Sequence, residues 1–428
     1  MPQADQQLRS DRDAPAHALA AFLPPHAGAL IGLLTPQDRE TLDRIALSPP
    51  ARSAFPAASM TAIMKATRLC NLRCTYCHSW RGAPSRPMTF EVMARATRDL
   101  LSSPAVREVD FVWHGGEVTL LPVAFFAKAV YLQLLFKRTG QTVRNAIQTN
   151  ATLISDGWID FWQAHDFEVG VSIDATPELH DSRRLDKAGR GSWAAVQRGV
   201  ARLKAGGIRF GGLAVLTEDV LAVDPARYLE SLAECGLTGV ALLNAIPDAS
   251  GERRDGDSYL PFDAFVDFMV RLYAVWDDRF RGVLSIREFE SLENNVADGK
   301  PLICVHSASC MGRFITVEPT GEVAPCDKYD GGAGFHFGRL GVRSLADQIA
   351  DAPGMAALRA EEASLKAAMA PCPFVGVCRG GCPHDARMRA AAGLPGGCCG
   401  LRPLIEEIEA RKRRKSDGTS SRTDRGRI

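Results

Sequence analysis

The sequence predicts an α/β fold, in which helices cover a parallel sheet and a cysteine-rich segment follows it. From Met60 onward, strand-like and helix-like segments alternate six times, a rhythm typical of parallel sheets with helices outside. Residues 304–400 differ, because Cys, Gly and Pro become frequent there and the hydrophobic periodicity weakens. The expected strands are Thr61–Ala66, Glu108–Trp113, Val143–Thr149, Glu168–Ile173, Ile208–Leu216 and Gly239–Asn244. The expected helices are Phe90–Leu101, Ala124–Arg138, Asp156–His165, Ser192–Ala205, Pro225–Cys235 and Phe262–Trp276.

The length of 428 residues allows two or three domains, and a hydrophobic share of 46% permits a sizeable core. Two further helices are expected, over Pro36–Leu47 in an N-terminal extension of unassigned function and over Leu404–Lys412. The domain boundaries that we expect are an extension over residues 1–58, a core over 59–281, a linker over 282–303, a cysteine-rich domain over 304–404, and a terminal helix with a basic disordered tail over 405–428.

The overall composition indicates a soluble, cytoplasmic protein with no membrane partner. No stretch approaches the roughly 20 apolar residues of a membrane span. Pro24 and Pro25 interrupt the Ala-rich run near the N-terminus, so this run makes a poor signal peptide. Residues 411–427 hold eight basic and two acidic residues. We interpret them as a solvated tail, since nothing else in the sequence supports binding to nucleic acid.

Twelve cysteines raise the question of disulfides or metal. Disulfide frameworks suit small secreted domains, whereas here the cysteines cluster at 70–77 and 304–399 in a large chain without an export signal. Clustering of this kind favours metal. Cys235 lies outside both clusters, and we expect a buried structural thiol there.

The first cluster contains Cys70, Cys74 and Cys77 within one short loop. Three thiolates can hold three irons of a [4Fe–4S] cube and leave the fourth iron open to a small molecule, whereas electron-transfer clusters normally have four cysteines. A structural zinc site is the alternative, with His78 as a fourth ligand, but its position next to Cys77 strains a tetrahedral site.

The spacing of three residues and then two resembles that of the radical S-adenosylmethionine (SAM) enzymes. The resemblance implies an open, TIM-like (β/α)6 partial barrel, with the motifs at the carboxyl ends of its strands. It also implies that the open iron chelates the amino and carboxylate groups of SAM, and that an electron from the cluster cleaves SAM to a 5′-deoxyadenosyl radical.

Two further motifs match the SAM pocket of this family. Gly115, Gly116 and Glu117 follow the second strand, and the matching segment of the family contacts the amino group of SAM; Val118 stands where the family usually has proline. Without that context, Gly-Gly-Glu would be interpreted as a plain turn.

The fourth strand leads into a stretch that resembles the Ser-x-Asp-Gly…His-Asp-x-x-Arg pattern of sulfatase maturases and related enzymes. The match implies that Ser172 binds the ribose, that Arg184 binds the SAM carboxylate, and that Tyr76 packs near the adenine. Asp174 belongs to the same motif, and its alternative role is to cap the strand end. Ala175 replaces the usual glycine.

The C-terminal cysteines resemble the SPASM extension, which binds two auxiliary [4Fe–4S] clusters. Met369 stands where the pattern has its first later cysteine, so the second cluster is either completed by an extra cysteine, left with an open iron, or absent; zinc is the other alternative. By this resemblance the first cluster takes Cys304, Cys310, Cys326 and Cys382, and the second takes Cys372, Cys378 and one or both of Cys398 and Cys399.

The resemblance covers residues 60–402 and implies an oxidoreductase that modifies a peptide or protein and takes electrons from a donor such as flavodoxin or ferredoxin. We favour crosslinking of a ribosomally made peptide (a cyclophane), because Val118 and Met369 depart from the sulfatase-maturase pattern. The alternative is an anaerobic sulfatase maturase that forms formylglycine from Cys or Ser. Asp327 matches the proposed catalytic base of that branch, but the same Cys-Asp pair also occurs in the crosslinking branch and does not decide between them. Its alternative role is a turn or cap at the cluster loop. A non-catalytic iron–sulfur scaffold or electron carrier is the alternative from another class.

Overall fold

The fold is built on one ten-stranded sheet in the order β10-β9-β8-β1-β2-β3-β4-β5-β6-β7. Neighbouring strands are parallel from β8 through β1 to β7, and β9 and β10 are antiparallel. The computed structural model describes residues 30–47, 51–81, 85–245, 259–307, 310–329, 335–341, 343–391, 393 and 398–423. The strands are β1 (Ser59–Thr67), β2 (Glu108–Gly115), β3 (Thr142–Thr149), β4 (Phe167–Ser172), β5 (Phe210–Leu216), β6 (Gly239–Asn244), β7 (Ser285–Ile286), β8 (Phe314–Val317), β9 (Glu322–Ala324) and β10 (Gly338–Arg339).

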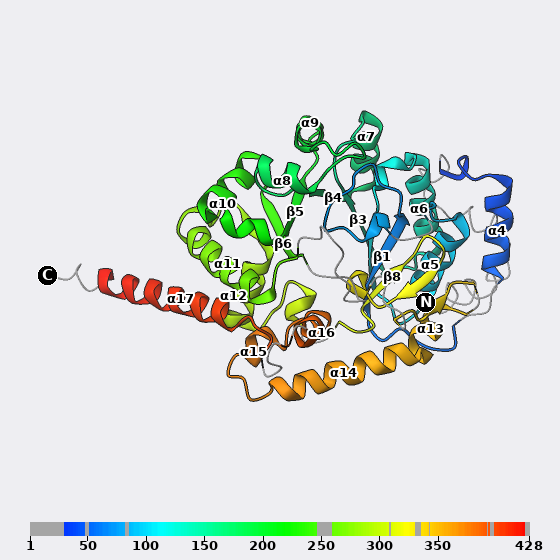
Figure 1. Cartoon of the computed structure of the whole chain (residues 1–428). Coiled ribbons are helices and arrows are strands. Elements are labelled where there is room, and N and C mark those ends of the chain that lie inside the picture. Colours follow the sequence, from blue (N-terminus) through cyan, green and yellow to red (C-terminus); the bar gives the residue numbers. More distant parts are fainter. Residues whose placement is uncertain are drawn as a thin grey trace.

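Helices cover the outside of this sheet and alternate with its strands along the chain (Figure 1). The predicted α/β fold is therefore confirmed, and all six predicted strands and their six helices begin and end within two residues of their expected bounds. The helices up to β7 are α4 (Pro36–Ala46), α5 (Phe90–Ser102), α6 (Val123–Phe136), α7 (Asp156–His165), α8 (Pro177–Arg183), α9 (Trp193–Ala205), α10 (Pro225–Glu234) and α11 (Phe262–Val275).

Local signals explain why these helices begin where they do. Thr35 and Asp38 form a reciprocal capping box at the start of α4, which satisfies two backbone groups that a helix end leaves unpaired. Asp224 accepts hydrogen bonds from two backbone N–H groups of α10, and Pro225 occupies its first position, where no N–H is needed. The N-terminal helix prediction is thus confirmed, while residues 1–29 lie outside the described part of the chain.

The stretch predicted as a linker, residues 282–303, instead contains β7 and a helix, α12 (Arg287–Asp298). β7 pairs with β6 at the edge of the sheet, and Glu288 of α12 accepts a hydrogen bond from the Leu242 backbone at 2.9 Å. A strand of two residues is too short to show alternating hydrophobicity, so no sequence pattern indicates this part of the sheet.

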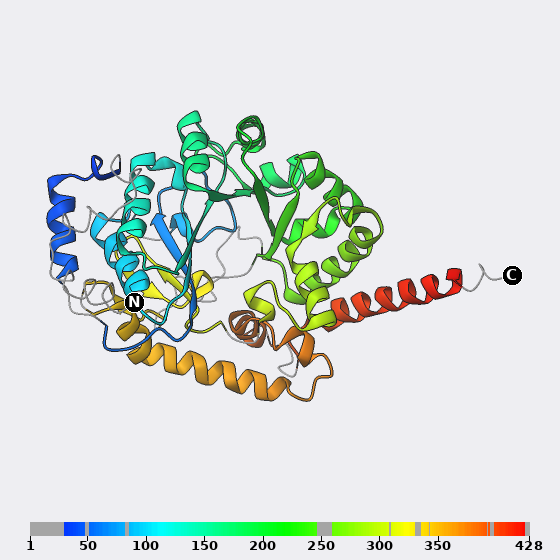
Figure 2. The same cartoon turned by 180° about the vertical axis from the view of Figure 1, so that it is seen from behind.

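The cysteine-rich segment contains more regular structure than its weak periodicity suggested. Its strand β8 pairs in parallel with β1, so this segment extends the sheet of the barrel directly. α14 runs along the molecule below the sheet, as seen from both sides in Figures 1 and 2. The helices of this part are α13 (Leu345–Asp351), α14 (Pro353–Met369), α15 (Val375–Cys378) and α16 (Pro383–Ala391).

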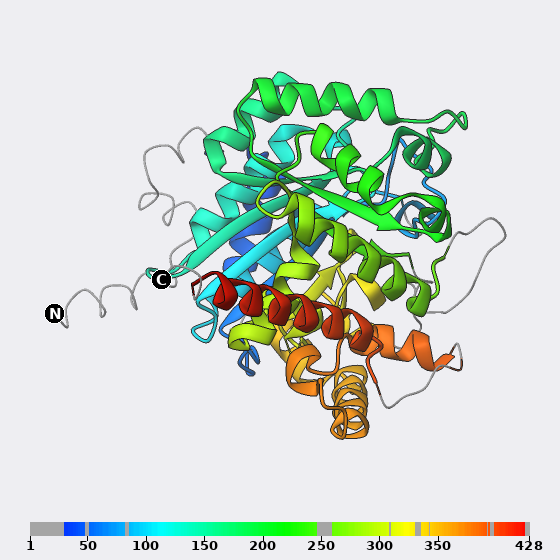
Figure 3. The same cartoon turned by 90° about the vertical axis from the view of Figure 1, so that its left-hand side faces the viewer.

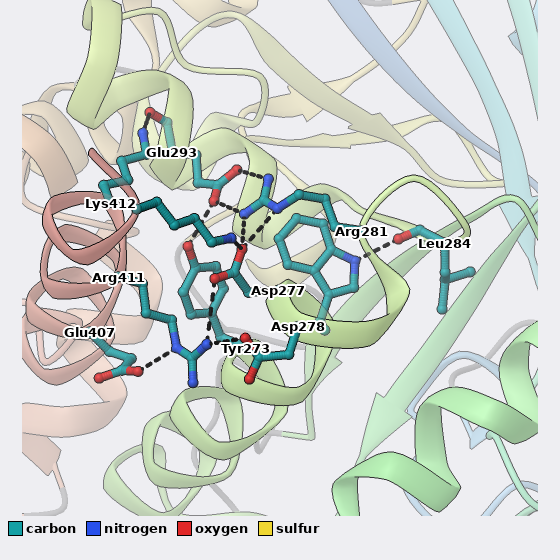
Figure 4. A network of polar contacts seen from close by, with 11 residues as sticks. Tyr273, Asp277, Asp278, Arg281, Leu284, Glu293, Glu407, Arg411 and Lys412 are labelled. Carbon is teal, nitrogen blue, oxygen red and sulfur yellow. Dashed lines mark hydrogen bonds and ion pairs between the residues drawn. The ribbon is translucent and has the colours of Figure 1, made fainter. Parts of the chain in front are cut away.

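The terminal helix α17 (Arg402–Thr423) is longer than expected, and it packs against α11 and α12 (Figure 3). The buried Asp277 carboxylate pairs with Arg281 at 2.6 Å, Lys415 at 2.5 Å and Arg411 at 3.5 Å (Figure 4). The first basic residues of the predicted disordered tail therefore belong to a folded interface, because a buried carboxylate needs cations around it. Residues 424–428 lie outside the described chain.

The cysteine outside the two clusters lies in the core. Cys235 is buried and accepts a hydrogen bond from Gln197 at 3.4 Å, as a structural thiol would. Among the described helices, none is long and apolar enough to cross a membrane.

Candidate active site at the carboxyl ends of the strands

The loop that carries the first three cysteines follows β1 and is held by the segment that follows β4. The Arg73 backbone N–H donates to the Leu185 carbonyl at 2.6 Å, and the Thr75 N–H donates to the Arg183 carbonyl at 3.0 Å. Two strands that are far apart in the sheet thus fix one loop across the mouth of the barrel.

The three thiols of this loop lie close enough to interact electrostatically. Burial raises the pKa of Cys70 to about 11, and it also raises the pKa values of Cys74 and Cys77. The Cys77 thiol further raises the pKa of Cys70, and the thiols of Cys70 and Cys77 further raise the pKa of Cys74. Ligand thiols must lose their protons to bind metal. A cationic centre among the three sulfur atoms would stabilise the thiolates, which burial alone disfavours.

The donor set consists of three thiols in one loop that interact with one another. A [4Fe–4S] cube takes each cysteine on a different iron. The three residues therefore fit the cluster that the sequence implies.

The Gly-Gly-Glu segment passes directly beneath this cysteine loop. The Gly116 N–H donates to the Thr67 carbonyl at 2.6 Å, and the Glu117 N–H donates to the Leu69 carbonyl at 2.7 Å. A Cβ on Gly116 would stand 2.0 Å from the Leu69 oxygen, so only glycine permits this approach. Gly115 has a φ of +125°, which also favours glycine.

The Glu117 carboxylate is buried and is occupied by protein donors. It accepts hydrogen bonds from the Thr149 hydroxyl at 2.6 Å, the Asn150 backbone at 2.7 Å, and both the backbone and hydroxyl of Thr119 at 3.0 and 2.5 Å. Burial raises the pKa of this carboxyl despite these contacts. The side chain thus ties the end of β2 to the end of β3, and we expect any contact of this segment with a ligand to come from its backbone.

The end of β4 holds a buried ion pair between Asp174 and Arg184. The guanidinium Nε and Nη2 donate to the two carboxylate oxygens at 2.8 and 3.0 Å. The Tyr76 hydroxyl donates to Asp174 at 3.0 Å, and its ring lies under the guanidinium. Arg184 lowers the pKa of Asp174, although burial opposes it. The predicted pocket residues are therefore brought together, with Arg184 held from one side by Asp174.

The ribose candidate, Ser172, lies at the end of β4, and its hydroxyl accepts a hydrogen bond from Gln148 of β3 at 2.9 Å. Ala175 adopts a φ of +27°, in the region that favours the glycine usual at this position. The backbone path of the motif is therefore retained with alanine.

The His and Asp of this motif support Arg184 from behind, a role that sequence reasoning missed. His180 Nδ1 accepts from the Asp174 N–H at 3.3 Å, and Nε2 lies 3.0 Å from the Ser192 hydroxyl, which donates to the Arg184 carbonyl at 2.6 Å. The Asp181 carboxylate accepts from the Trp193 N–H at 2.7 Å. Both side chains fix the turn that carries Arg184.

Asp327 directly follows Cys326, just after β9, and faces the mouth of the barrel. Its Oδ1 lies 2.8 Å from Lys65 Nζ of β1, and its Oδ2 lies 3.7 Å from His114 Nε2 of β2. Its side chain is 44% exposed. Its negative charge helps to raise the pKa of Cys77 in the first cysteine loop. This carboxylate therefore connects the two cysteine-bearing parts of the molecule.

The cysteines assigned to the first auxiliary cluster interact with one another. Burial raises the pKa of Cys310 to about 12, and the thiols of Cys382 and Cys304 add to the shift. Burial also raises the pKa of Cys326, and the thiols of Cys382 and Cys310 raise it further. Lys328 Nζ lies 3.8 Å from the Cys382 sulfur. These four cysteines could hold one cluster between them, and their assignment to it stays a prediction.

The second set gathers around the turn at Gly380 and Gly381. A Cβ on Gly380 would stand 3.3 Å from the buried Met369 methyl group, and one on Gly381 would stand 3.1 Å from Cys399 Cβ. A hydrogen bond with the Cys399 thiol lowers the pKa of Cys378. Met369 and Cys399 thus flank the same turn. The remaining candidates, Cys372 and Cys398, both lie within electrostatic reach of Arg402.

Comparison with known proteins agrees with this site. The model of the radical SAM superfamily matches residues 64–241. A serine-type anaerobic sulfatase-maturating enzyme of Klebsiella aerogenes is 31% identical over 332 residues, which cover 77% of this chain and 80% of that protein. A cysteine-type enzyme of Clostridium perfringens is 29% identical over 275 residues, which cover 62% of this chain and 74% of that protein.

Solved structures share the fold over most of this chain. Native anSMEcpe with bound AdoMet has a TM-score of 0.74 and 25% identity, over 84% of this chain and 99% of that chain. The structure of native anSMEcpe with AdoMet and the Cp18Cys peptide has the same TM-score and coverage at 24% identity. The protein is therefore a radical SAM enzyme that acts on a peptide or protein, with a [4Fe–4S] cluster and SAM as cofactors. The chain belongs to the anaerobic sulfatase-maturating enzyme family within the radical SAM superfamily.

Proposed function

We propose that this protein oxidises a serine or cysteine side chain of a sulfatase to formylglycine. The observation that carries the proposal is the placement of Asp327, which Lys65 holds at 2.8 Å and whose charge reaches Cys77. The similarity to serine-type and cysteine-type sulfatase-maturating enzymes supports this reaction above the crosslinking that we favoured from the sequence. Val118 and Met369, which pointed away from it, are both buried in the fold.

The proposed roles follow the geometry. Cys70, Cys74 and Cys77 hold the SAM cluster, and the pocket of SAM is formed by Tyr76, Gly115, Gly116, Glu117, Ser172, Asp174 and Arg184. The C-terminal cysteines hold the auxiliary clusters, and an electron donor such as flavodoxin or ferredoxin supplies the reducing electron.

Formation of the aldehyde from serine removes a hydrogen atom from Cβ, one electron, and the hydroxyl proton. When bound, SAM and the clusters supply the abstraction of the hydrogen atom and accept the electron. The proton needs an acceptor on the protein, and we assign this role to the Asp327 carboxylate, which Lys65 holds at 2.8 Å. For cysteine, the thiol proton leaves in the same way, and the thioaldehyde then takes up water and releases hydrogen sulfide.

The test uses anaerobically reconstituted full-length protein with SAM, dithionite and sulfatase-derived peptides that carry Ser, Cys or Ala at the target. We expect an aldehyde in the Ser or Cys peptide, captured by a hydrazine reagent, and none in the Ala peptide. Crosslinking and serine oxidation each remove two hydrogen atoms from the peptide, so mass alone does not separate the two reactions. A peptide that loses two hydrogens but does not react with hydrazine would contradict the proposal.

Asp327→Asn separates the base from the cofactor site. We expect this variant to cleave SAM to 5′-deoxyadenosine while aldehyde formation falls about 100-fold or more, in the range of general acid–base catalysis. Asp110→Asn on β2 is a matched control, because its carboxylate pairs with Arg144 away from the site. Full aldehyde formation by Asp327→Asn would remove Asp327 from the mechanism.

A further inference from the structure

A buried ammonium group lies at the carboxyl end of β1, five positions before Cys70 in the chain. The side chain of Lys65 is 1% exposed, and its Nζ pairs with Glu318 at 3.1 Å and with Asp327 at 2.8 Å. Nothing in the sequence motifs accounts for this residue. It is the point at which the barrel meets two carboxylates of the cysteine-rich segment.

The position of Lys65 is fixed by the sheet itself. β1 and β8 pair in parallel with Met64 opposite Val317, so the next residues along the two strands are Lys65 and Glu318. Glu318 is held in turn by Arg68, with both contacts at 2.8 Å. The two cations and two carboxylates form a balanced set, which offsets the cost of burying charge.

The contacts of Asp327 divide its two oxygens. Lys65 holds Oδ1, while Oδ2 faces His114 at 3.7 Å, which is longer than a hydrogen bond. Lys65 therefore fixes one edge of a carboxylate whose side chain is 44% exposed. A carboxylate on a short surface turn would otherwise have several rotamers to choose from.

We propose that Lys65 is a positioning residue, which holds the Asp327 carboxylate in the place where it takes the proton of the substrate. This inference rests on the proposed role of Asp327 as the base. It predicts that loss of Lys65 leaves SAM cleavage intact but uncouples it from oxidation of the peptide, because the base no longer stands in its productive place.

The experiment measures modified peptide formed per 5′-deoxyadenosine in reconstituted wild type, Lys65→Met and Lys65→Arg. We expect Lys65→Met to lower this ratio about 10- to 100-fold, the usual cost of a misplaced group, while its deoxyadenosine rate stays within about twofold of wild type. Lys65→Arg keeps the charge and should restore most of the ratio. Lys128→Met is the matched control, because it removes another paired lysine, bound to Asp38 at 2.6 Å far from the site.

A double-mutant cycle separates positioning from general damage. If Lys65 acts through Asp327, Lys65→Met should have no further effect on the ratio in an Asp327→Asn background. Additive effects, an unchanged ratio in Lys65→Met, or a parallel loss of deoxyadenosine formation would each overturn the proposal. The ratio counts whichever oxidised peptide the wild type forms, so a product other than formylglycine refutes the proposed function without hiding the coupling.

Discussion

The buried pair between Asp174 and Arg184 offers a quantitative test of how the SAM pocket is built. Their side chains are 1% and 5% exposed, and two hydrogen bonds of 2.8 and 3.0 Å join them. Asp174→Asn preserves the shape of the side chain but leaves the Arg184 cation without its partner. Removal of one partner from a buried pair costs about 3–5 kcal/mol, which is a large part of a typical unfolding free energy of about 5–15 kcal/mol.

The same substitution should weaken SAM binding, because it releases the guanidinium that is proposed to meet the SAM carboxylate. A lost hydrogen bond to a charged group costs about 1.5–3 kcal/mol, which corresponds to an affinity about 10- to 150-fold lower. Stability is measured by anaerobic urea unfolding at matched iron content, and affinity is measured by titration with SAM.

Asp186→Asn provides the matched comparison, since Asp186 pairs with the exposed Arg190 one turn away in sequence. We expect this control to leave both stability and SAM affinity close to those of wild type, because surface pairs are weak. The reasoning would be refuted if Asp174→Asn lost less than about 1 kcal/mol of stability, or if the control lost as much as Asp174→Asn.

Three further predictions concern other parts of the molecule. Burial lowers the pKa of His180 to about 3, below its value of about 6.5 in the unfolded chain. The contribution of neutral His180 to stability is therefore present above pH 6.5 and is lost as the pH falls. We expect the free energy of unfolding in urea to be about 2 kcal/mol lower at pH 5 than at pH 8, and we expect His180→Gln to abolish this difference. Asp277→Asn should remove the buried partner of two cations of α17, Arg411 and Lys415. Trypsin should then cleave α17 faster than in wild type with no change in SAM cleavage, and equal protection would show that the Asp277 contacts do not hold this helix. Cys399→Ala should remove about four irons, and Met369→Cys in that variant should restore them, because Met369 and Cys399 flank one turn; iron content that does not respond to Cys399 would exclude it as a ligand.

The barrel could be predicted from the sequence because its strands are buried apolar runs and its helices carry strong end signals. β1, for example, is a nine-residue strand whose side chains are mostly buried, and α7 matches its expected bounds of Asp156–His165. By contrast, β7 and β10 have two residues each, which is too short for any periodicity to show. Their pairing depends on neighbours that are distant in sequence.

The site divides in the same way. The cysteine spacing and the motif after β4 indicated which residues would meet, and the structure brings Tyr76, Asp174 and Arg184 together. The carboxylate network of Glu117 and the contacts of Lys65 could not be predicted, because their partners come from other strands. Arg68 and Glu318 are 250 residues apart, and no local pattern encodes such a pair.

The most direct test of the account compares iron content and SAM cleavage in reconstituted wild type and in Cys70→Ala/Cys74→Ala/Cys77→Ala. We expect roughly twelve irons per wild-type chain, and roughly four fewer in the variant, in keeping with three [4Fe–4S] clusters of which one needs this loop. We also expect wild type to form 5′-deoxyadenosine with SAM and dithionite and the variant to form none. Cleavage that survives the triple substitution, or that never occurs in wild type, would contradict the assignment of this loop as the SAM-cluster site.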